Sequence, residues 1–433
     1  MVTIRIPKLV GQIGLSSGSA VIVQGTTLLL VVFLSNLLGP SGLARFAVTQ
    51  NTVTAISSVA QAGLSLTAST YIAKYHFRDD SLTRQILRLC LGVTLVLGCV
   101  VAGILALGSN LIATEIYGDG KLANMVLIAA ATLPFAAVVL TQNGVLNGFA
   151  RYKSQFWTAV VSSAILLAAA GLGAVFWGAM GSALGFAGAT LVRATILWRV
   201  IALHVPSPAA KDFSLRETWS RIRNFAIPAG LAGLTLTPST WLASALLLNF
   251  RGLEELGVFL AALSIRSAVS FLPQQIGTTF LPYFLRLDGN SGVNESYYFG
   301  RILALMTGVA VIVSVPIALF SPYILSVFGS EFIAGSTILN CLLLGVVIES
   351  ASLAFSNRYA ARERMWSVLL FFTFPKDILL VIVAFVAIPT FGGLGLAIAY
   401  LTSALYGLFS YALIAKSQDW QLFGQGSRPD DLP

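Results

Sequence analysis

Long apolar runs alternate with short polar segments along almost the whole chain, and each run can cross a bilayer as a helix of about 20 residues. The runs are continuously apolar, so they do not fit the alternating strands of a membrane β-barrel. The pattern predicts an all-α polytopic membrane protein with about 12 transmembrane helices. The expected spans are 11–38, 42–73, 90–107, 122–147, 156–177, 179–201, 225–248, 256–284, 302–320, 333–355, 366–388 and 392–414.

The segment from Phe33 to Gly63 shows how the spans are connected. Its first helix ends at the turn Gly39-Pro40-Ser41-Gly42, because Gly and Pro favour chain reversal. The helix that follows is rich in Ser, Thr and Gln. In a membrane, such a helix must face other protein or a water-filled cavity.

The same unit recurs in the second half of the chain. The matched glycines are Gly42 with Gly257, Gly63 with Gly277, Gly118 with Gly329, and Gly181 with Gly392. Any two apolar segments look somewhat alike, but the nearly constant separation of these pairs argues against chance. We therefore expect two pseudo-symmetric six-helix lobes around a central cavity, related by an axis along the membrane normal. We divide the chain into an N-terminal lobe (1–203), an amphipathic connector (204–224), a C-terminal lobe (225–415) and a tail (416–433).

Composition supports a membrane protein and sets its orientation. Hydrophobic residues make up 57% of the 433 residues and charged residues only 10%, against about 25% charged in soluble domains. The net charge of +9 comes from Lys and Arg that flank the spans, which argues against nucleic-acid binding. Only Arg45, Lys121 and Arg251 fall on the side opposite the termini, so both termini and the connector are expected in the cytoplasm. No metal-ligand spacing or disulfide framework is visible, and no metal site is expected.

Several loose motifs along nearly the whole chain resemble the polysaccharide repeat-unit (O-antigen-type) flippases of the multidrug/oligosaccharidyl-lipid/polysaccharide exporter superfamily. The motifs are Leu38-Gly-Pro-Ser-Gly-Leu-Ala-Arg-Phe-Ala47, Gly144-Val-Leu-Asn-Gly-Phe-Ala-Arg-Tyr-Lys153, Arg223-Asn-Phe-Ala-Ile-Pro228 and Ile324-Leu-Ser-Val-Phe-Gly-Ser-Glu-Phe332. The resemblance implies transport of undecaprenyl-diphosphate-linked oligosaccharides across the bacterial inner membrane for surface polysaccharide biosynthesis. It also implies a cationic cavity, cycling driven by H+ or Na+, and a polymerase and chain-length regulator as partner proteins.

Three arginines within or near the spans are candidates for binding the diphosphate. A charge at bilayer depth costs several kcal/mol, so it marks a functional site by default, and Arg offers bidentate donors to phosphate. Arg266 lies mid-span, whereas Arg45 and Arg193 are close enough to span ends to snorkel to an interface instead. Amide side chains suit sugar hydroxyls, although hydrogen bonds between helices explain them equally well. The amides within or at the ends of spans are Gln24, Gln50, Asn51, Gln61, Gln142, Asn143, Gln274 and Gln275, of which we expect Gln24, Gln50 and Gln275 to line the cavity.

Acidic residues within spans are candidates for ion coupling. Lys376 and Asp377 follow Pro375 in the middle of the eleventh span, where a proline frees a backbone carbonyl. We expect Asp377 to titrate or bind a cation, with Lys376 as its neighbour; a self-neutralising pair is the alternative. Glu349 is the second candidate, although it lies nearer the cytoplasmic end of its span and an interfacial role also fits.

Two other functions remain open. A multidrug or small-molecule cation antiporter of the same superfamily also has twelve spans. A membrane-embedded polysaccharide polymerase or glycosyltransferase is the rival from a different class. Such an enzyme needs a sizeable catalytic loop, but the outward segments are short and both histidines, His76 and His204, fall on the cytoplasmic side. We therefore expect a transporter, with no catalytic residues.

Overall fold

The computed structural model describes residues 6–61, 63–76, 79–205, 218–220, 222–223, 226, 236–287, 295–361 and 369–416, and these contain helices and no strands. Nine of the helices are long and apolar enough to cross a membrane. Two of the nine, α1 and α6, contain a kink and supply two spans each, so the nine hold eleven spans. The shorter α8, 16 residues long, overlaps the predicted seventh span. The predicted all-α membrane fold is confirmed.

The long helices of the first half are α1 (Ile6–Ala60), α2 (Leu64–Tyr75), α3 (Asp80–Leu107), α5 (Ala123–Gly148) and α6 (Tyr152–Ala202). Those of the second half are α8 (Leu236–Arg251), α9 (Leu253–Leu287), α10 (Glu295–Leu319), α12 (Ser336–Ala361), α14 (Phe374–Phe391) and α15 (Gly393–Lys416). The short helices α4 (Ser109–Leu111) and α11 (Ser321–Ser326) lie in connections between spans. Two π-helical turns, Ile112–Ile116 and Leu369–Thr373, and two 3-10 turns, Gly120–Leu122 and Ser330–Gly335, complete the description.

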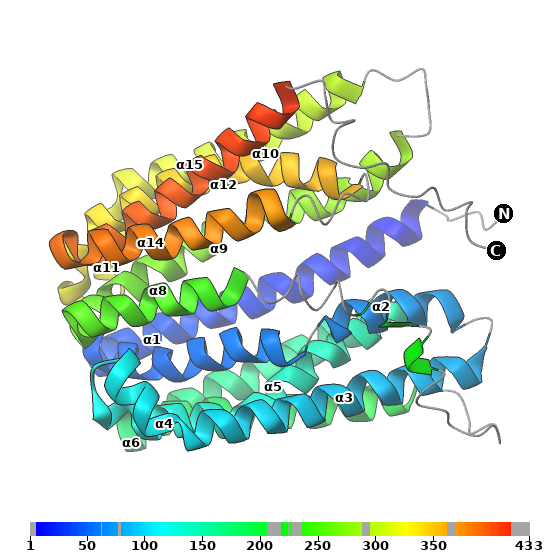
Figure 1. Cartoon of the computed structure of the whole chain (residues 1–433), viewed down its shortest axis with the longest axis horizontal. Coiled ribbons are helices and arrows are strands. Elements are labelled where there is room, and N and C mark those ends of the chain that lie inside the picture. The colour runs from blue at the N-terminus through cyan, green and yellow to red at the C-terminus, as the bar shows by residue number, and fades with distance from the viewer. Residues whose placement is uncertain are drawn as a thin grey trace.

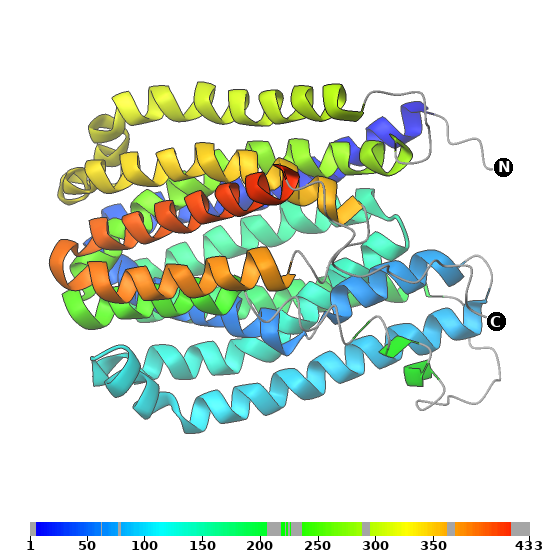
Figure 2. The ribbon, with the colours of Figure 1, turned by 45° about the horizontal axis from the view of Figure 1, so that its top comes forward.

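The helices form two lobes that run side by side along the long axis of the molecule (Figures 1 and 2). Helices α1–α6 pack on one another in the N lobe, α8–α15 do so in the C lobe, and α1 meets α9 between them. The chain turns at Gly39, Gly178, Gly252 and Gly392, all with positive φ. The junctions of α8 with α9 and of α14 with α15 lie at the same end in Figure 1, which we call the hairpin end. The opposite end, where α1 begins and α15 ends, is the terminal end.

Many hydroxyl side chains inside the spans bond to a carbonyl of their own helix. Thr94 donates to the Cys90 carbonyl at 2.8 Å and Thr132 to the Ile128 carbonyl at 2.7 Å, each one turn earlier. This back-bonding lets Ser and Thr remain in an apolar helix without an unpaired donor. The polar character of the spans therefore does not by itself mark a site, and the cavity must be located from contacts between helices.

Glycine geometry confirms an internal repeat and corrects one matched pair. Gly178 and Gly392 adopt nearly the same left-handed turn, with φ of 60° and 57°, so Gly178 rather than Gly181 is the counterpart of Gly392. Gly181 is helical, and a Cβ there would overlap the Gly173 carbonyl across the hairpin. Gly395 meets the Ala387 carbonyl in the same way in the second repeat. Small residues let the two arms of each hairpin approach closely.

Two predicted spans differ in detail from the structure. The second span breaks after Ala60, and α2 begins at Leu64 behind Gly63, whose φ is 68°. Its repeat counterpart, α9, continues through Gly277 to Leu287. In the eleventh span, α14 begins at Phe374 after a π-helical turn, so Lys376 and Asp377 occupy its first turn and not the middle of one regular helix.

Parts of other predicted segments lie outside the described residues. These are most of the connector 204–224, the tail beyond Lys416, and the beginnings of the seventh and eleventh spans. The boundaries assigned to the two lobes, the connector and the tail therefore stay predictions.

Candidate functional site

A charged cluster inside the C lobe joins α9, α12 and α14. Arg266 on α9 donates from Nη2 to Glu349 Oε2 on α12 at 2.5 Å. Lys376 Nζ on α14 lies 3.8 Å from the other carboxylate oxygen, Oε1 of Glu349. The Arg266 side chain is 15% exposed and that of Glu349 is 35% exposed, so the pair is shielded but reachable. One carboxylate thus bridges two cations contributed by separate helices.

Two further residues extend this cluster. The guanidinium of Arg266 lies over the ring of Tyr400 on α15, with Cζ 5.0 Å from the ring centroid. Such a cation–π contact contributes about 0.5–2 kcal/mol, more when it is desolvated. Asp377 is 7% exposed, and its Oδ2 has no hydrogen-bond partner in the described structure. Asp377 directly follows Lys376 in the chain, at the start of α14.

Two cavities meet at the Arg266–Glu349 pair. The first, about 410 Å³, lies between α9, α12, α14 and α15, and Glu349 and Lys376 line it together with Gln274 and several serines. The second, about 210 Å³, lies between the lobes, where Arg266 and Tyr400 of the C lobe face Asn51 of the N lobe. The ion pair therefore separates an interlobe space from a cavity inside the C lobe.

The cluster is suited to binding an anion and exchanging a cation. Arg266 Nε has no hydrogen-bond partner in the described structure, so the guanidinium has donor capacity beyond its bond to Glu349. With Asp377 protonated, two cations and one carboxylate leave one excess positive charge, which favours a phosphate group. With Asp377 ionised, the formal charges cancel. The affinity of the cluster for an anion can therefore depend on whether Asp377 holds a proton or another cation.

A hydrogen-bonded aromatic cluster joins the lobes nearer the hairpin end. Trp241 Nε1 on α8 donates to Tyr117 Oη at 2.8 Å and to Thr52 Oγ1 at 3.1 Å, and these two hydroxyls are 2.8 Å apart. The side-chain amide of Asn249 also donates to the Ile116 carbonyl at 3.2 Å, and that of Asn36 to the Val327 carbonyl at 2.7 Å. The bonds made by Trp241, Asn249 and Asn36 cross from one lobe to the other, whereas the Thr52–Tyr117 bond lies within the N lobe.

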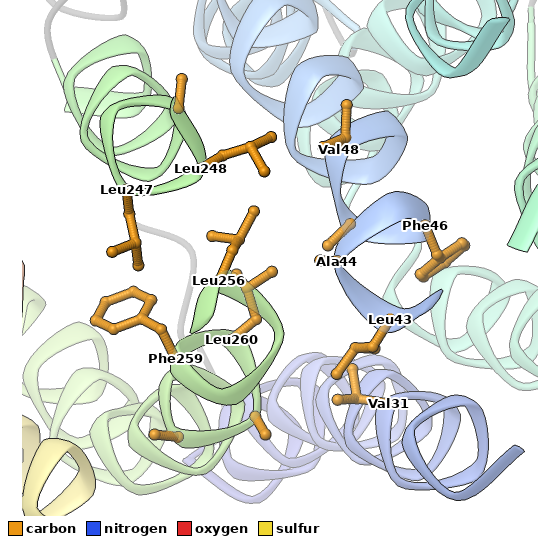
Figure 3. Packing of buried hydrophobic residues seen from close by; sticks show 14 of the residues in the cluster. Val31, Leu43, Ala44, Phe46, Val48, Leu247, Leu248, Leu256, Phe259 and Leu260 are labelled. Atoms are coloured by element: carbon orange, nitrogen blue, oxygen red, sulfur yellow. The ribbon is translucent and has the colours of Figure 1, made fainter. Parts of the chain in front are cut away.

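An apolar seam accompanies these bonds. In Figure 3, Leu248, Leu256 and Leu260 of the C lobe face Leu43 and Val48 of α1. At the tightest point, a Cβ on Gly257 would overlap the carbonyl oxygen of Pro40. The lobes are therefore in direct contact at the hairpin end, and this contact closes the interlobe space from that side.

The structure brings only some of the predicted residues together. Arg266, Glu349 and Lys376 form the cluster, and Asp377 lies beside it. The ion pair with Arg266 makes Glu349 part of the cluster. The interfacial role that its sequence position also allows stays a prediction. The remaining candidates are all half-buried and line neither cavity: Arg45, Arg193, Gln24, Gln50 and Gln275. Their roles stay predictions.

Sequence reasoning named the amides of the cavities but missed two aromatic residues, Tyr400 and Trp241. Of the amides named from the sequence, Asn51 lines the interlobe space and Gln274 the C-lobe cavity, whereas their neighbours Gln50 and Gln275 line neither. One residue along a helix changes the direction of a side chain by about 100°. Tyr400 and Trp241 carried no signal, because an aromatic residue in an apolar span usually belongs to the core.

The fold matches solved transporters across nearly its full length. An inward-facing multidrug resistance MATE family transporter of the MOP superfamily aligns with a TM-score of 0.76 and 17% identity, covering 90% of this chain and 95% of that one. The lipid II flippase MurJ, in an inward closed conformation, also gives 0.76, with 13% identity and 93% and 87% coverage. A MOP superfamily transporter from Pyrococcus furiosus gives 0.67, with 17% identity and 93% and 95% coverage.

These matches show the fold, and the sequence shows the family. A search of curated protein sequences gave no match. The profile of the family described as "Polysaccharide biosynthesis protein" matches residues 9–288, which is more than half of the chain. The resemblance noted in the sequence motifs is thereby confirmed. This multi-pass membrane protein, with the transporter fold of the MOP superfamily, belongs to the polysaccharide biosynthesis protein family.

Proposed function

We propose that the protein flips undecaprenyl-diphosphate-linked oligosaccharide repeat units across the bacterial inner membrane by ion-coupled alternating access. The observation that carries the proposal is the Arg266–Glu349–Lys376 cluster, which places two cations inside a transporter of a polysaccharide biosynthesis family. An uncharged sugar does not require buried cations, whereas a diphosphate does. The protein acts as a transporter and not as an enzyme of polymer synthesis; a polymerase and a chain-length regulator would act on its product.

Coupling to an ion follows from the charge balance of the cluster. In the proposed cycle, H+ or Na+ bound at Asp377 neutralises this carboxylate. The positive charges of Arg266 and Lys376 then exceed the negative charge of Glu349, which favours binding of the diphosphate. Loss of that ion restores a neutral cluster and favours release. The same ion therefore sets the affinity for substrate in each half of the cycle, as alternating access requires.

The distribution of Lys and Arg supports a cytoplasmic position for the terminal end. The hairpin end is then periplasmic, and a molecule whose lobes touch at that end is closed to the outside. We therefore assign the structure to the inward-facing half of the cycle, in which a lipid-linked substrate made in the cytoplasm can enter. Opening of the seam around Gly257 would complete the cycle.

A multidrug or small-molecule cation antiporter is the second candidate, and the buried Asp377 favours it, because an unpaired carboxylate can also bind an organic cation. The two functions differ in the charge of the cargo. A flippase requires the cations of the cluster, whereas a cation exporter requires only the carboxylates.

Deletion of the gene tests the proposal directly. In a strain that makes the surface polymer, we expect undecaprenyl-diphosphate-linked repeat units to accumulate on the cytoplasmic face, measured by extraction and by their protection from an external glycosidase. Complementation with the intact chain should clear them. Normal polymer without accumulation, together with increased drug sensitivity, would instead support the antiporter.

Replacing Asp377 with Asn should abolish the response to the coupling ion. In proteoliposomes, we expect the Asp377→Asn variant to flip substrate at the same low rate with and without an imposed H+ or Na+ gradient. The amide neither takes up a proton nor carries a negative charge to neutralise Arg266 and Lys376. Substrate binding at equilibrium should persist. Asp80→Asn, at the exposed start of α3, is the matched control and should keep the gradient response. A gradient response retained by Asp377→Asn would remove that residue from coupling.

A further inference from the structure

A second cavity system lies outside the translocation path, on the N lobe. A groove of about 790 Å³ runs between α3, α5 and α6, and it shares no residue with the two cavities around Arg266. Its rim includes the exposed apolar side chains Leu95, Leu191 and Trp198. Helix α3 forms the outer edge of its lobe in both views (Figures 1 and 2), so the groove can open toward lipid.

Two arginines stand at the terminal end of this groove. Arg84 and Arg88 are one turn apart on α3, and both line it. Among the described contacts, neither makes an ion pair. Gly92 and Leu95 continue the same face toward the hairpin end, about 12 and 16 Å from Arg84 along the helix at 1.5 Å per residue. The groove therefore carries positive charge at its mouth and an apolar surface along its length.

The floor of the groove is fixed by a hydrogen bond between helices. Gln142 on α5 is buried, and its Nε2 donates to the Ala194 carbonyl on α6 at 3.1 Å. This bond holds α5 against α6 beneath the opening. Gly92 contributes no side chain, and a Cβ there would meet no atom within 4 Å. The groove is therefore unobstructed at Gly92.

We propose that this groove binds an anionic phospholipid of the leaflet at the terminal end. Its phosphate would lie between Arg84 and Arg88, and one acyl chain would follow the apolar wall past Gly92 to Leu95. Charge complementarity selects an anionic headgroup, since juxtamembrane Lys and Arg each contribute to attraction toward acidic lipids. The apolar length suits an acyl chain and excludes a soluble phosphate compound as the occupant. The site does not depend on which substrate the protein transports.

Native mass spectrometry of the full chain in detergent, titrated with phosphatidylglycerol or phosphatidylcholine, tests the site. We expect the intact protein to bind phosphatidylglycerol preferentially. The Arg84→Ala/Arg88→Ala variant should lose about tenfold in phosphatidylglycerol affinity, with little change for phosphatidylcholine. Arg199→Ala, an exposed arginine on α6 outside the groove, is the matched control and should bind as the intact protein does.

A second pair of variants tests the apolar part. Gly92→Phe should fill the groove and lower phosphatidylglycerol binding, whereas Gly103→Phe, equally unobstructed on α3 but outside the groove, should not. Equal binding by Gly92→Phe and the intact protein would overturn the proposal. Displacement of phosphatidylglycerol by equimolar undecaprenyl diphosphate, with loss of that competition in Arg84→Ala/Arg88→Ala, would also overturn it, because the groove would then be a substrate site.

Discussion

Transport of lipid-linked oligosaccharide by the Arg266→Gln variant is expected to fall by about ten- to hundredfold. Hydrogen bonds to charged groups contribute roughly 1.5–3 kcal/mol each, and 1.4 kcal/mol is a factor of ten in affinity. Arg266 is the cation of the cluster that lines the interlobe space, so it meets a substrate that enters between the lobes. The measurement is the initial rate of flipping in proteoliposomes, together with equilibrium binding of the substrate in detergent.

The loss has two possible causes, and a double-mutant cycle separates them. If Arg266 only neutralises Glu349, then Arg266→Gln/Glu349→Gln should recover transport, because no carboxylate is left unpaired. If Arg266 binds the diphosphate, the double variant should remain as impaired as Arg266→Gln. We expect the second result, since Lys376 can still partner Glu349 when Arg266 is replaced. Recovery of transport in the double variant would show that Arg266 only neutralises Glu349 and does not bind the substrate.

Much of the fold follows from hydrophobic length alone. The predicted apolar runs are helical almost everywhere that the structure describes them, because a chain in lipid must satisfy its backbone within each span. The break at Gly63 did not follow, although its counterpart Gly277 looks the same in sequence. In the N lobe, α2 lies so close to α5 that a Cβ on Gly144 would overlap the Ser65 carbonyl. Such packing depends on neighbours far along the chain, which a local pattern does not contain.

The candidate site was predictable in its charges but not in its contacts. Arg266 stood out because an isolated cation at bilayer depth is costly. Its partner Glu349 is 83 residues away, and their meeting depends on the rotation of α9 against α12. Tyr400 could not be identified at all, because a cation–π contact leaves no trace in a single sequence. The sequence shows which charged residues are buried and therefore need partners. The packing of the helices determines which residues become those partners.

The hairpin-end contact gives the second large prediction. Gly257→Val should shift the protein away from the state in which the lobes touch, because any Cβ at this position overlaps the Pro40 carbonyl. Overpacking costs about 1–3 kcal/mol, which changes the population ratio roughly five- to hundredfold. Spin labels at the exposed positions Leu111 and Tyr323, one on each lobe, should report a longer distance in a variant whose three native cysteines are replaced.

A glycine inside one lobe provides the control. Gly181→Val creates the same kind of overlap, with the Gly173 carbonyl, but both residues belong to one hairpin of the N lobe. We expect this variant to lower thermal stability and to leave the interlobe distance unchanged. An unchanged distance in Gly257→Val would contradict the assignment of a gate to this contact. Lipid is as apolar as leucine, so the seam gains little from hydrophobic burial and depends on close approach and interlobe hydrogen bonds. A single added side chain at its tightest point should therefore be enough to open it.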